Sequence, residues 1–381
     1  MRILLSGYYG FGNAGDEAVL AGTLTALRRR LPSVEVTVLS ARPEATAAEY
    51  GVRTAQRWHW PTIWRELGRS DLVLQGGGGL VQDSSSRLSP LYYLGILLAA
   101  RLRRKPFAVY AQGIGPLSGG PVRWLTGRLL QGAAAIAVRD EASAALLAQI
   151  GVPRGVEVTA DAAALLDPAP AGQVAPWLPR PRTGPLIGLA LREAPGCERL
   201  VEGAIAAGRR LRELTGGQCL AMAFHARDDG PLARRAAEEA GGTVVGGSEN
   251  GTDTFSDVGK CVCPIFRPTP GEWLGVVASL DFLVAMRLHA AIFAAATGVP
   301  FVALSYDPKV AAFAHRLGAP CVEIDADPHE IVEVTERAWE ARGCEADRRR
   351  AAAARLRQEA ERNIDLVADL ARRIGEQTNT P

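Results

Sequence analysis

The stretch from Asp281 to Val310 constrains the fold of this chain more than any other. It predicts an apolar strand, a short turn, an Ala-rich helix that a glycine ends, and a second apolar strand. Arg287 and His289 lie in the turn, and Lys309 follows the second strand. Two strands joined in this way run parallel. The sequence therefore predicts that Arg287, His289 and Lys309 come to one edge of a sheet.

Strands and helices alternate through both halves of the chain, which is typical of doubly wound parallel sheets. Residues 70–110 and 280–304 also echo each other, because each holds an apolar strand, a turn, a helix and a strand that begins with Pro-Phe. We predict an α/β fold with two Rossmann-like doubly wound domains that face a cleft, as in the GT-B arrangement.

The domain boundaries follow from composition. The run from about 167 to 185 is rich in Pro, Ala and Gly and cannot form a continuous helix or a central strand. We therefore predict an N-terminal domain (1–168), a linker (169–185), a C-terminal domain (186–328) and charged C-terminal helices (329–381). These helices could pack across both domains, and the last few residues are expected to be disordered.

The overall composition is that of a soluble globular protein. The chain has 48% hydrophobic and 22% charged residues, with 43 basic against 41 acidic side chains. A nucleic-acid-binding protein would carry a stronger basic bias, so no nucleic-acid partner is expected. The N-terminus lacks the long apolar region of a secretory signal, and no segment reaches about 18 uninterrupted apolar residues. We expect a cytoplasmic protein, and the sequence does not reveal its oligomeric state.

The residues Arg287, His289 and Lys309, which we call the basic trio, indicate a particular chemistry. Arginine offers a planar fork of donors to a carboxylate or phosphate, and lysine offers a compact ammonium. His289 stands where a helix begins, and backbone N–H groups favour an anion there. Ligands of parallel sheets bind outside the carboxyl ends of the strands. These residues predict a small anionic ligand that undergoes proton transfer. Alternatively, Arg287 caps a strand end, His289 is satisfied within the fold and Lys309 is solvated.

Two glycine-rich segments follow apolar strands in the N-terminal half. Gly12, Asn13, Gly15 and Asp16 belong to a loop that leads into a helix, a layout in which backbone N–H groups face an anion. The spacing is neither the dinucleotide fingerprint nor the Walker loop. Asp16 and Glu17 could instead cap the helix. The second segment, Gly76-Gly77-Gly78-Gly79, is predicted to be a loop that faces a ligand, because glycine lets another group approach closely.

Two further strand ends carry polar candidates. Gln112 is predicted to open a loop after the strand that begins at Phe107. Arg139 follows the strand 135–138 and is placed as Arg287 is. The structural alternative for Arg139 is an ion pair with the neighbouring Asp140 or with Glu141.

An apolar run and then a basic run extend from Leu91 to Lys105. This order is typical of an interfacial helix that contacts anionic lipid, and equally of a buried helix with cations at its C-terminus. The sequence favours the buried helix and keeps peripheral membrane contact as the alternative.

The cysteines give no zinc signature. Cys261 and Cys263 form the closest pair, with one residue between them and no second pair nearby, so we interpret them as part of a strand (261–265). We expect neither a metal nor another cofactor.

Four motifs resemble those of the polysaccharide pyruvyltransferase family. They are Gly-Asn-Ala-Gly-Asp-Glu (12–17), Val-Arg-Asp-Glu-Ala-Ser (138–143), Arg-Leu-His (287–289) and Tyr-Asp-Pro-Lys (306–309). They occur in order over most of the chain, and the fit is best to the cell-wall, CsaB-type branch, which serves surface-layer anchoring. The resemblance also implies the GT-B-like arrangement.

The resemblance implies a donor and an acceptor. The donor would be phosphoenolpyruvate, whose enolpyruvyl group becomes a ketal on a sugar while phosphate leaves. By position, Arg139, Arg287 and Lys309 would hold its anionic groups and His289 would act as general acid or base, since histidine changes charge near neutral pH. The acceptor would be a lipid-linked N-acetylmannosamine unit, with both glycine segments and Gln112 as candidate contacts.

Two other classes of function fit parts of the sequence. A GT-B nucleotide-sugar glycosyltransferase would share the glycine segments and the cleft. A non-catalytic sugar- or lipid-binding protein would keep its ligand affinity without His289 and would release no phosphate.

Overall fold

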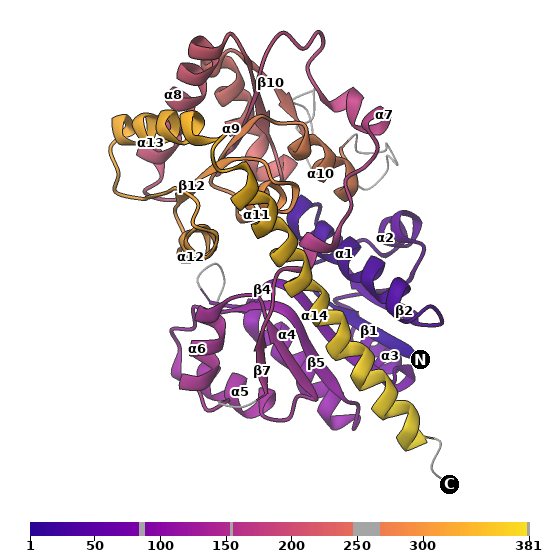
Figure 1. The fold of residues 1–381 in the computed structure, drawn as a ribbon. Helices are drawn as coiled ribbons and strands as arrows, with labels where there is room; N and C mark the ends of the chain where they lie inside the picture. Colours follow the sequence, from indigo (N-terminus) through magenta and orange to yellow (C-terminus); the bar gives the residue numbers. More distant parts are fainter. Residues whose placement is uncertain (84–87, 153–154, 247–266, 379–381) are drawn as a thin grey trace. The chain divides into compact units, whose positions relative to one another are not determined.

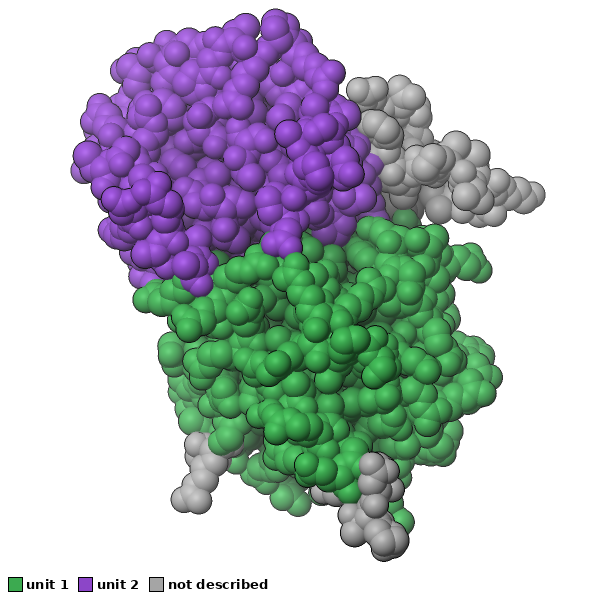
Figure 2. All heavy atoms as spheres, turned by 45° about the vertical axis from the view of Figure 1, so that its right-hand side comes forward, with its two compact units in different colours: residues 1–166, 355–381 green, residues 167–354 purple. Residues whose placement is uncertain are grey.

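The computed structural model describes residues 1–83, 88–152, 155–246 and 267–378. It divides into two compact units, which Figure 2 colours separately: unit 1 comprises residues 1–166 and 355–381, and unit 2 comprises residues 167–354. The predicted strand 261–265 and the last three residues lie outside the described residues.

Unit 1 is built on a seven-stranded sheet, with the order β3-β2-β1-β4-β5-β6-β7. Figure 1 draws this sheet in indigo to magenta, with β1, β2, β4, β5 and β7 labelled. All its strand pairs are parallel. Its strands are β1 (Arg2–Ser6), β2 (Glu35–Ser40), β3 (Arg53–Gln56), β4 (Leu72–Val81), β5 (Phe107–Ile114), β6 (Ala135–Val138) and β7 (Val156–Val158). Its helices are α1 (Ala14–Arg30), α2 (Pro43–Tyr50), α3 (Trp60–Arg69), α4 (Ser89–Leu102), α5 (Gly120–Leu130), α6 (Glu141–Gln149) and the short η1 (Ala162–Leu165).

Unit 2 repeats this plan with six strands, in the order β10-β9-β8-β11-β12-β13, again all parallel. Its strands are β8 (Leu186–Ala190), β9 (Gln218–Met222), β10 (Gly242–Val245), β11 (Phe282–Ala285), β12 (Phe301–Ser305) and β13 (Cys321–Glu323). Its helices are α7 (Ala171–Val174), η2 (Ala175–Trp177), α8 (Glu198–Thr215), α9 (Ala226–Ala240), α10 (Pro270–Ala278), α11 (Leu288–Thr297), α12 (Pro308–Leu317) and α13 (Pro328–Ala341). The run 169–185 thus contains short helical turns and belongs to unit 2.

The central strands are buried on both faces, as parallel sheets require. Every residue of β5, β8 and β12 is buried, so their sequences are apolar runs rather than alternating patterns. Several helices begin where a short polar side chain caps them: Asn13 caps α1, Asp140 caps α6 and Asp307 caps α12. Local chemistry thus sets where these three helices start.

The last helix, α14 (Ala346–Thr378), contributes to both units. Within unit 1 the buried Asn363 fixes it to the end of β7, where its amide accepts from the Thr159 hydroxyl (2.7 Å) and donates to the Ala160 carbonyl (2.9 Å). No helix in the described part of the chain has the length and apolarity needed to cross a membrane.

Candidate active site

Both sheets have a point where the strand order reverses. In unit 1 this switch point lies between β1 and β4, and in unit 2 between β8 and β11. Ligands of doubly wound sheets bind in the crevice outside the carboxyl ends of the strands at such a point. The residues that follow these four strands are therefore the first candidates for a site.

Arg287 stands at the switch point of unit 2. Its backbone N–H donates to the Ala190 carbonyl at the end of β8 (3.2 Å), and its side chain is only 8% exposed. One guanidinium nitrogen, Nη2, donates to the Asp229 carboxylate on α9. The Nε atom is buried and has no acceptor among the described residues. A ligand oxygen would satisfy this N–H, because buried polar groups almost always have a partner.

Asp229 holds this arginine in place. The carboxylate is 1% exposed, and its second oxygen accepts from the backbone N–H of His225, the cap of α9 (2.9 Å). A charge this deeply buried needs a charged or hydrogen-bonded partner. Asp229 lies 58 residues before Arg287, and no local pattern marks a helical aspartate as the partner of a distant arginine.

Tyr306 and Arg192 extend the cluster around Arg287. Tyr306 follows β12, and the Arg192 guanidinium, just after β8, lies 5.9 Å from the centroid of its ring. Burial raises the pKa of Tyr306, while the positive charges of Arg192 and Arg287 oppose that rise. The phenol is therefore neutral at physiological pH and close to both guanidinium groups. No role had been predicted for Arg192, Tyr306 or Asp229, although Tyr306 opens the Tyr-Asp-Pro-Lys motif.

The other two members of the basic trio also lie at this edge. Arg287 caps α11, so His289 is the second residue of that helix, and it is half-buried. Lys309 lies in the first turn of α12, beside Arg287's strand, because β11 and β12 are neighbours. Its ammonium contacts the Asp307 carboxylate at 2.9 Å. The trio is thus placed at one edge, but Arg287 and Lys309 each have an acidic partner of their own.

The first glycine segment of unit 1 is closed by its own helix. The buried carboxylate of Glu17 on α1 accepts from the backbone N–H groups of Gly10 (2.9 Å) and Gly12 (3.4 Å). Asn13 accepts from the Gly15 N–H (3.1 Å) and donates to Asp16 (2.6 Å). Backbone donors predicted to face an anion are therefore occupied by side chains of the same segment, and an external anion would compete with Glu17.

The second glycine segment is not a loop. Gly76, Gly77, Gly78 and Gly79 lie inside β4, which runs on to Val81, so the predicted loop is wrong. The structure requires glycine here for packing: a Cβ at Gly77 would lie 1.9 Å from a methyl carbon of Val19 on α1, and one at Gly78 would lie 2.8 Å from the Asp16 carboxylate. Of the four glycines, Gly79 alone is exposed.

Gln112 likewise belongs to a strand. It lies within β5 and pairs in register with Gly78 and with Val138, so the predicted loop begins later. Its amide is fully buried and has no hydrogen-bond partner among the described residues. Gln75 on β4 is in the same situation. Two buried amides without partners on adjacent strands are unusual, since each costs about 1–3 kcal/mol if it stays unsatisfied.

Arg139 forms the counterpart of the Arg287 cluster in unit 1. Its guanidinium donates to the buried carboxylate of Asp161 at 3.0 Å and lies 3.6 Å from Asp140. It packs flat against Gly113, where a Cβ would approach the guanidinium to 2.8 Å, and it lies 4.0 Å from the Cβ position of Gly79. The predicted Asp140 contact is present, and the more deeply buried partner is Asp161, which the sequence analysis missed.

A second buried arginine, Arg57, follows β3. It is 2% exposed and donates to the Gly7 carbonyl (2.8 Å) and to the Tyr93 hydroxyl (3.1 Å). Its guanidinium lies 4.9 Å from the ring of Phe11, which stacks on Tyr8 with a 4.0 Å centroid separation. No carboxylate among the described residues pairs with Arg57. Tyr8 is partly exposed, so this stack presents an aromatic surface beside the glycine segment.

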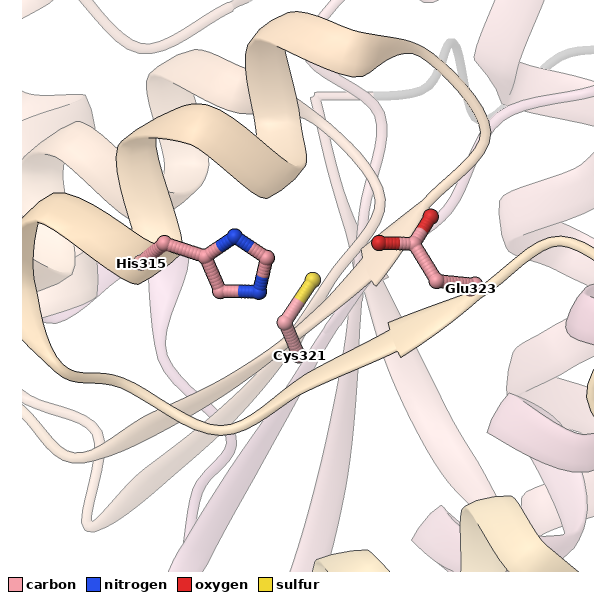
Figure 3. A group of neighbouring side chains, drawn as sticks. All are labelled: His315, Cys321 and Glu323. Atoms are coloured by element: carbon pink, nitrogen blue, oxygen red, sulfur yellow. The ribbon is translucent and has the colours of Figure 1, made fainter.

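One group of side chains in unit 2 could hold a metal ion. His315 near the end of α12 and Cys321 and Glu323 on β13 have ligand atoms that all lie within 4.8 Å of one another (Figure 3). Nitrogen, sulfur and oxygen donors of this kind suit Zn²⁺. Burial raises the pKa of Cys321 to about 11, with Glu323 adding to the rise, so a metal would have to displace the thiol proton. The group lies on the outermost strand, whereas Arg287 follows a central one.

Comparison with solved structures identifies the fold. The chain is similar to a UDP-GlcNAc 2-epimerase from Neisseria meningitidis bound to UDP-GlcNAc, with a TM-score of 0.61 and 11% identity over 97% of this chain and 100% of the other. It is also similar to S. aureus MnaA with UDP, with a TM-score of 0.61 and 13% identity over 96% of this chain and 95% of the other. A glycosyltransferase from Rickettsia africae matches with a TM-score of 0.57 and 11% identity over 100% of this chain and 99% of the other. These likenesses show two Rossmann-like domains of the GT-B kind, which confirms the predicted fold class.

The comparison at the level of sequence is more specific. None of the curated proteins matches the chain. The family model for polysaccharide pyruvyl transferase matches residues 13–308, a segment that includes Asn13, Arg139, Arg287 and His289 and ends beside Lys309. Since this match covers most of the chain, the protein belongs to the polysaccharide pyruvyl transferase family.

Proposed function

We propose that the protein transfers the enolpyruvyl group of phosphoenolpyruvate to two hydroxyls of a sugar, forming a ketal and releasing phosphate. One observation carries the proposal beyond family membership. Arg287 is buried at the β8/β11 switch point with Asp229 on one nitrogen and an unused Nε–H, so an anionic ligand would complete its hydrogen bonds.

The reaction requires several proton and charge movements. The methylene carbon of the donor takes a proton and becomes a methyl group, C2 bonds to two sugar oxygens, and its bond to the phosphate oxygen breaks. The two sugar hydroxyls lose two protons in all. One proton matches the proton that the methylene carbon gains, and the other is taken up by the departing phosphate. A cationic site stabilises the charge on the departing phosphate.

The residues of unit 2 suit these tasks. Arg287 would bind the donor carboxylate or phosphate through its free edge, and the neutral phenol of Tyr306 would add a hydrogen-bond donor. Lys309 would supply a second cation, although it would have to exchange Asp307 for the donor. His289, in the first turn of α11, would move the proton as general acid or base.

We propose that unit 1 contacts the acceptor. Arg139 would bind an anionic group, with its charge anchored by Asp161. The exposed Gly79, the buried amide of Gln112 and the Tyr8–Phe11 stack offer close backbone approach, hydrogen bonds and an aromatic face to a sugar. The acceptor that we propose is an N-acetylmannosamine unit on a lipid diphosphate, as in the CsaB-type cell-wall branch, and the reaction would occur in the cytoplasm without a metal or other cofactor.

The test is phosphate release from phosphoenolpyruvate with a synthetic N-acetylmannosaminyl disaccharide or its lipid-linked form. We expect acceptor-dependent release that falls about 100-fold or more in His289→Gln, since general acid–base catalysis contributes roughly 10²–10⁴. Arg287→Lys keeps the charge but loses the planar fork, so it should raise the KM for the donor. His329→Gln, at an exposed histidine of α13 in the same unit, is the matched control and should be unchanged.

The outcomes separate the alternatives. No release with any acceptor would overturn pyruvyl transfer. If phosphate release is unaffected by both substitutions, the proposed reaction is supported, but its active site does not include Arg287 and His289. Turnover of a UDP-sugar without phosphoenolpyruvate would instead support a nucleotide-sugar glycosyltransferase.

A further inference from the structure

The outer surface of α3, α4 and α5 in unit 1 is unusually apolar. We call it the Trp-Leu face, and it consists of large side chains that are all at least two-fifths exposed. Trp124 is 67%, Leu102 66% and Trp58 58% exposed. The other members are Trp60, Trp64, Leu91 and Leu98. Single exposed apolar residues are normal in proteins, but a contiguous group marks a contact surface.

Helix α4 joins these residues, because α3 packs against it and so does α5, which carries Trp124. Gly95 of α4 contacts Trp60 of α3, whose ring would lie 3.4 Å from a Cβ at that glycine. Trp58 packs on Tyr92 of α4 at 5.0 Å between ring centroids. The Arg103 guanidinium, which follows α4, lies 5.0 Å from the centroid of the Trp64 ring.

Helix α4 is apolar on both of its sides. Tyr93, Leu94, Ile96 and Leu97 are buried against the sheet. Leu91, Gly95, Leu98 and Leu102 recur at helical spacing (i, i+4, i+7, i+11) on the opposite side, and the three leucines are exposed. The buried side packs in the core, whereas the outer leucines leave much of their apolar surface in solvent. The apolar sequence of α4 therefore indicates two contacts: its inner side packs in the core, and its outer leucines form an apolar surface that another molecule can contact.

The surroundings of the Trp-Leu face are positively charged. Residues 88–138 contain no aspartate or glutamate. Cations lie at the end of α4 and on α5: Arg101, Arg103, Arg104, Lys105, Arg123 and Arg128. The acid of α3, Glu66, is buried and already contacts Arg53, Arg65 and Arg69. The whole chain has a net charge of only +2, so this concentration of charge is local.

We propose that the Trp-Leu face binds the surface of an anionic lipid bilayer. Tryptophan prefers the boundary between headgroups and acyl chains, leucine inserts below it, and arginine and lysine contact the lipid phosphates. A second copy of the chain is a poorer occupant, because a symmetric dimer would place two basic surfaces against each other. The proposal does not depend on the reaction catalysed, since it rests on surface residues of unit 1.

The test uses the full-length protein and vesicles of phosphatidylcholine with and without about 30% phosphatidylglycerol. We expect the parent to bind the anionic vesicles and to lose binding as salt rises, because exposed charges are screened. Arg101→Gln/Arg128→Gln should weaken the partition coefficient about 25-fold, since each cation near the surface contributes about 1 kcal/mol, or roughly fivefold. Leu98→Ser/Trp124→Ser should weaken it at least tenfold by removing inserted apolar area.

A matched control removes the same kinds of side chain elsewhere. Leu214 is 51% exposed and Arg209 is exposed, both on α8 of unit 2, so Arg209→Gln/Leu214→Ser should bind like the parent. Brominated lipids give a second readout, because they should quench the tryptophan fluorescence of the bound parent if the tryptophans of the face insert into the bilayer. Circular dichroism would show that each variant is folded.

Three results would overturn the proposal. The parent could fail to bind anionic vesicles at low salt, the two face variants could bind as well as the control, or sedimentation could show a dimer that only the face variants dissociate. The last result would make the Trp-Leu face an interface between copies of the chain.

Discussion

The pair formed by Arg287 and Asp229 gives the sharpest test of the site. The two side chains are 8% and 1% exposed, so removing the carboxylate leaves a buried guanidinium without its partner. Breaking a buried ion pair in this way costs about 3–5 kcal/mol. Asp229→Ala should therefore lower the free energy of unfolding by that amount, which corresponds to a fall in Tm of roughly 6–20 °C for a unit of this size.

Variants at the same pair separate charge from shape. Asp229→Asn keeps an acceptor for the His225 N–H but loses the charge, and should cost about 1.5–3 kcal/mol, the range of a hydrogen bond to a charged group. Arg287→Met/Asp229→Leu replaces both partners with apolar groups and should recover most of the stability, because burying two charges is itself costly. The recovered protein should still lack phosphoenolpyruvate turnover.

Urea unfolding followed by circular dichroism measures these changes. The control is Asp228→Ala on the same helix, whose side chain is 58% exposed and contacts His225, and which should change stability by no more than about 1 kcal/mol. If Asp229→Ala also costs under 1 kcal/mol, or if the double variant is less stable than Asp229→Ala, the buried charge pair does not hold the site as we describe.

Three further outcomes follow from the structure. Gly77→Ala should lower the free energy of unfolding by about 2–4 kcal/mol, as measured by thermal unfolding. The φ angle of Gly77 is +27°, and the new methyl would lie 1.9 Å from a carbon of Val19 on α1. An unchanged stability would contradict the packing of α1 on β4. Asp161→Ala should cost about 3–5 kcal/mol by urea unfolding because it removes the buried carboxylate that neutralises Arg139, and a cost below 1 kcal/mol would mean that solvent or Asp140 compensates for it. Burial raises the pKa of Tyr93 to about 12 and also raises the pKa of four other tyrosines. Their unfolded pKa is about 10, so the stabilisation from these neutral phenols is present below pH 10 and is lost as the pH rises from about 10 to 12. Absorbance titration should show five of the seven tyrosines ionising late, together with unfolding, and ionisation of all seven near pH 10 in the folded protein would refute this.

Some strands with continuous apolar sequence could be predicted closely. The predicted strand 135–138 coincides with β6, and the two apolar strands predicted between Asp281 and Val310 are β11 and β12. Such strands are buried on both faces, so burial alone determines their composition and polar residues mark their ends. The same reasoning placed Arg287 and Lys309 at one edge of the sheet.

Glycine misled the sequence analysis at β4 and β5. Both strands continue past the predicted ends, through Gly76–Gly79 and through Gln112 to Ile114. Glycine and polar residues are typical of loops, but here they are required because α1 and Tyr9 pack closely on β4. The close approach comes from residues far away in the sequence, so a local pattern cannot reveal it.

The Trp-rich segment near residue 60 shows a related limit. It forms α3, whose tryptophans face outward rather than into the core. Large aromatic residues are usually core residues, so their exposure on this helix is a property of the folded surface. Only the arrangement of α3, α4 and α5 shows that scattered residues form one face.

The sequence by itself determined the alternation of strands and helices, the parallel sheets and the edge at which the basic residues gather. These depend on hydrophobic periodicity and on short polar caps, which act over a few residues. The tertiary structure alone decided which acid neutralises which arginine: Asp229 for Arg287 and Asp161 for Arg139. Buried charges must find partners in space, and the distance between partners along the chain is set by the topology of the sheet rather than by any local pattern.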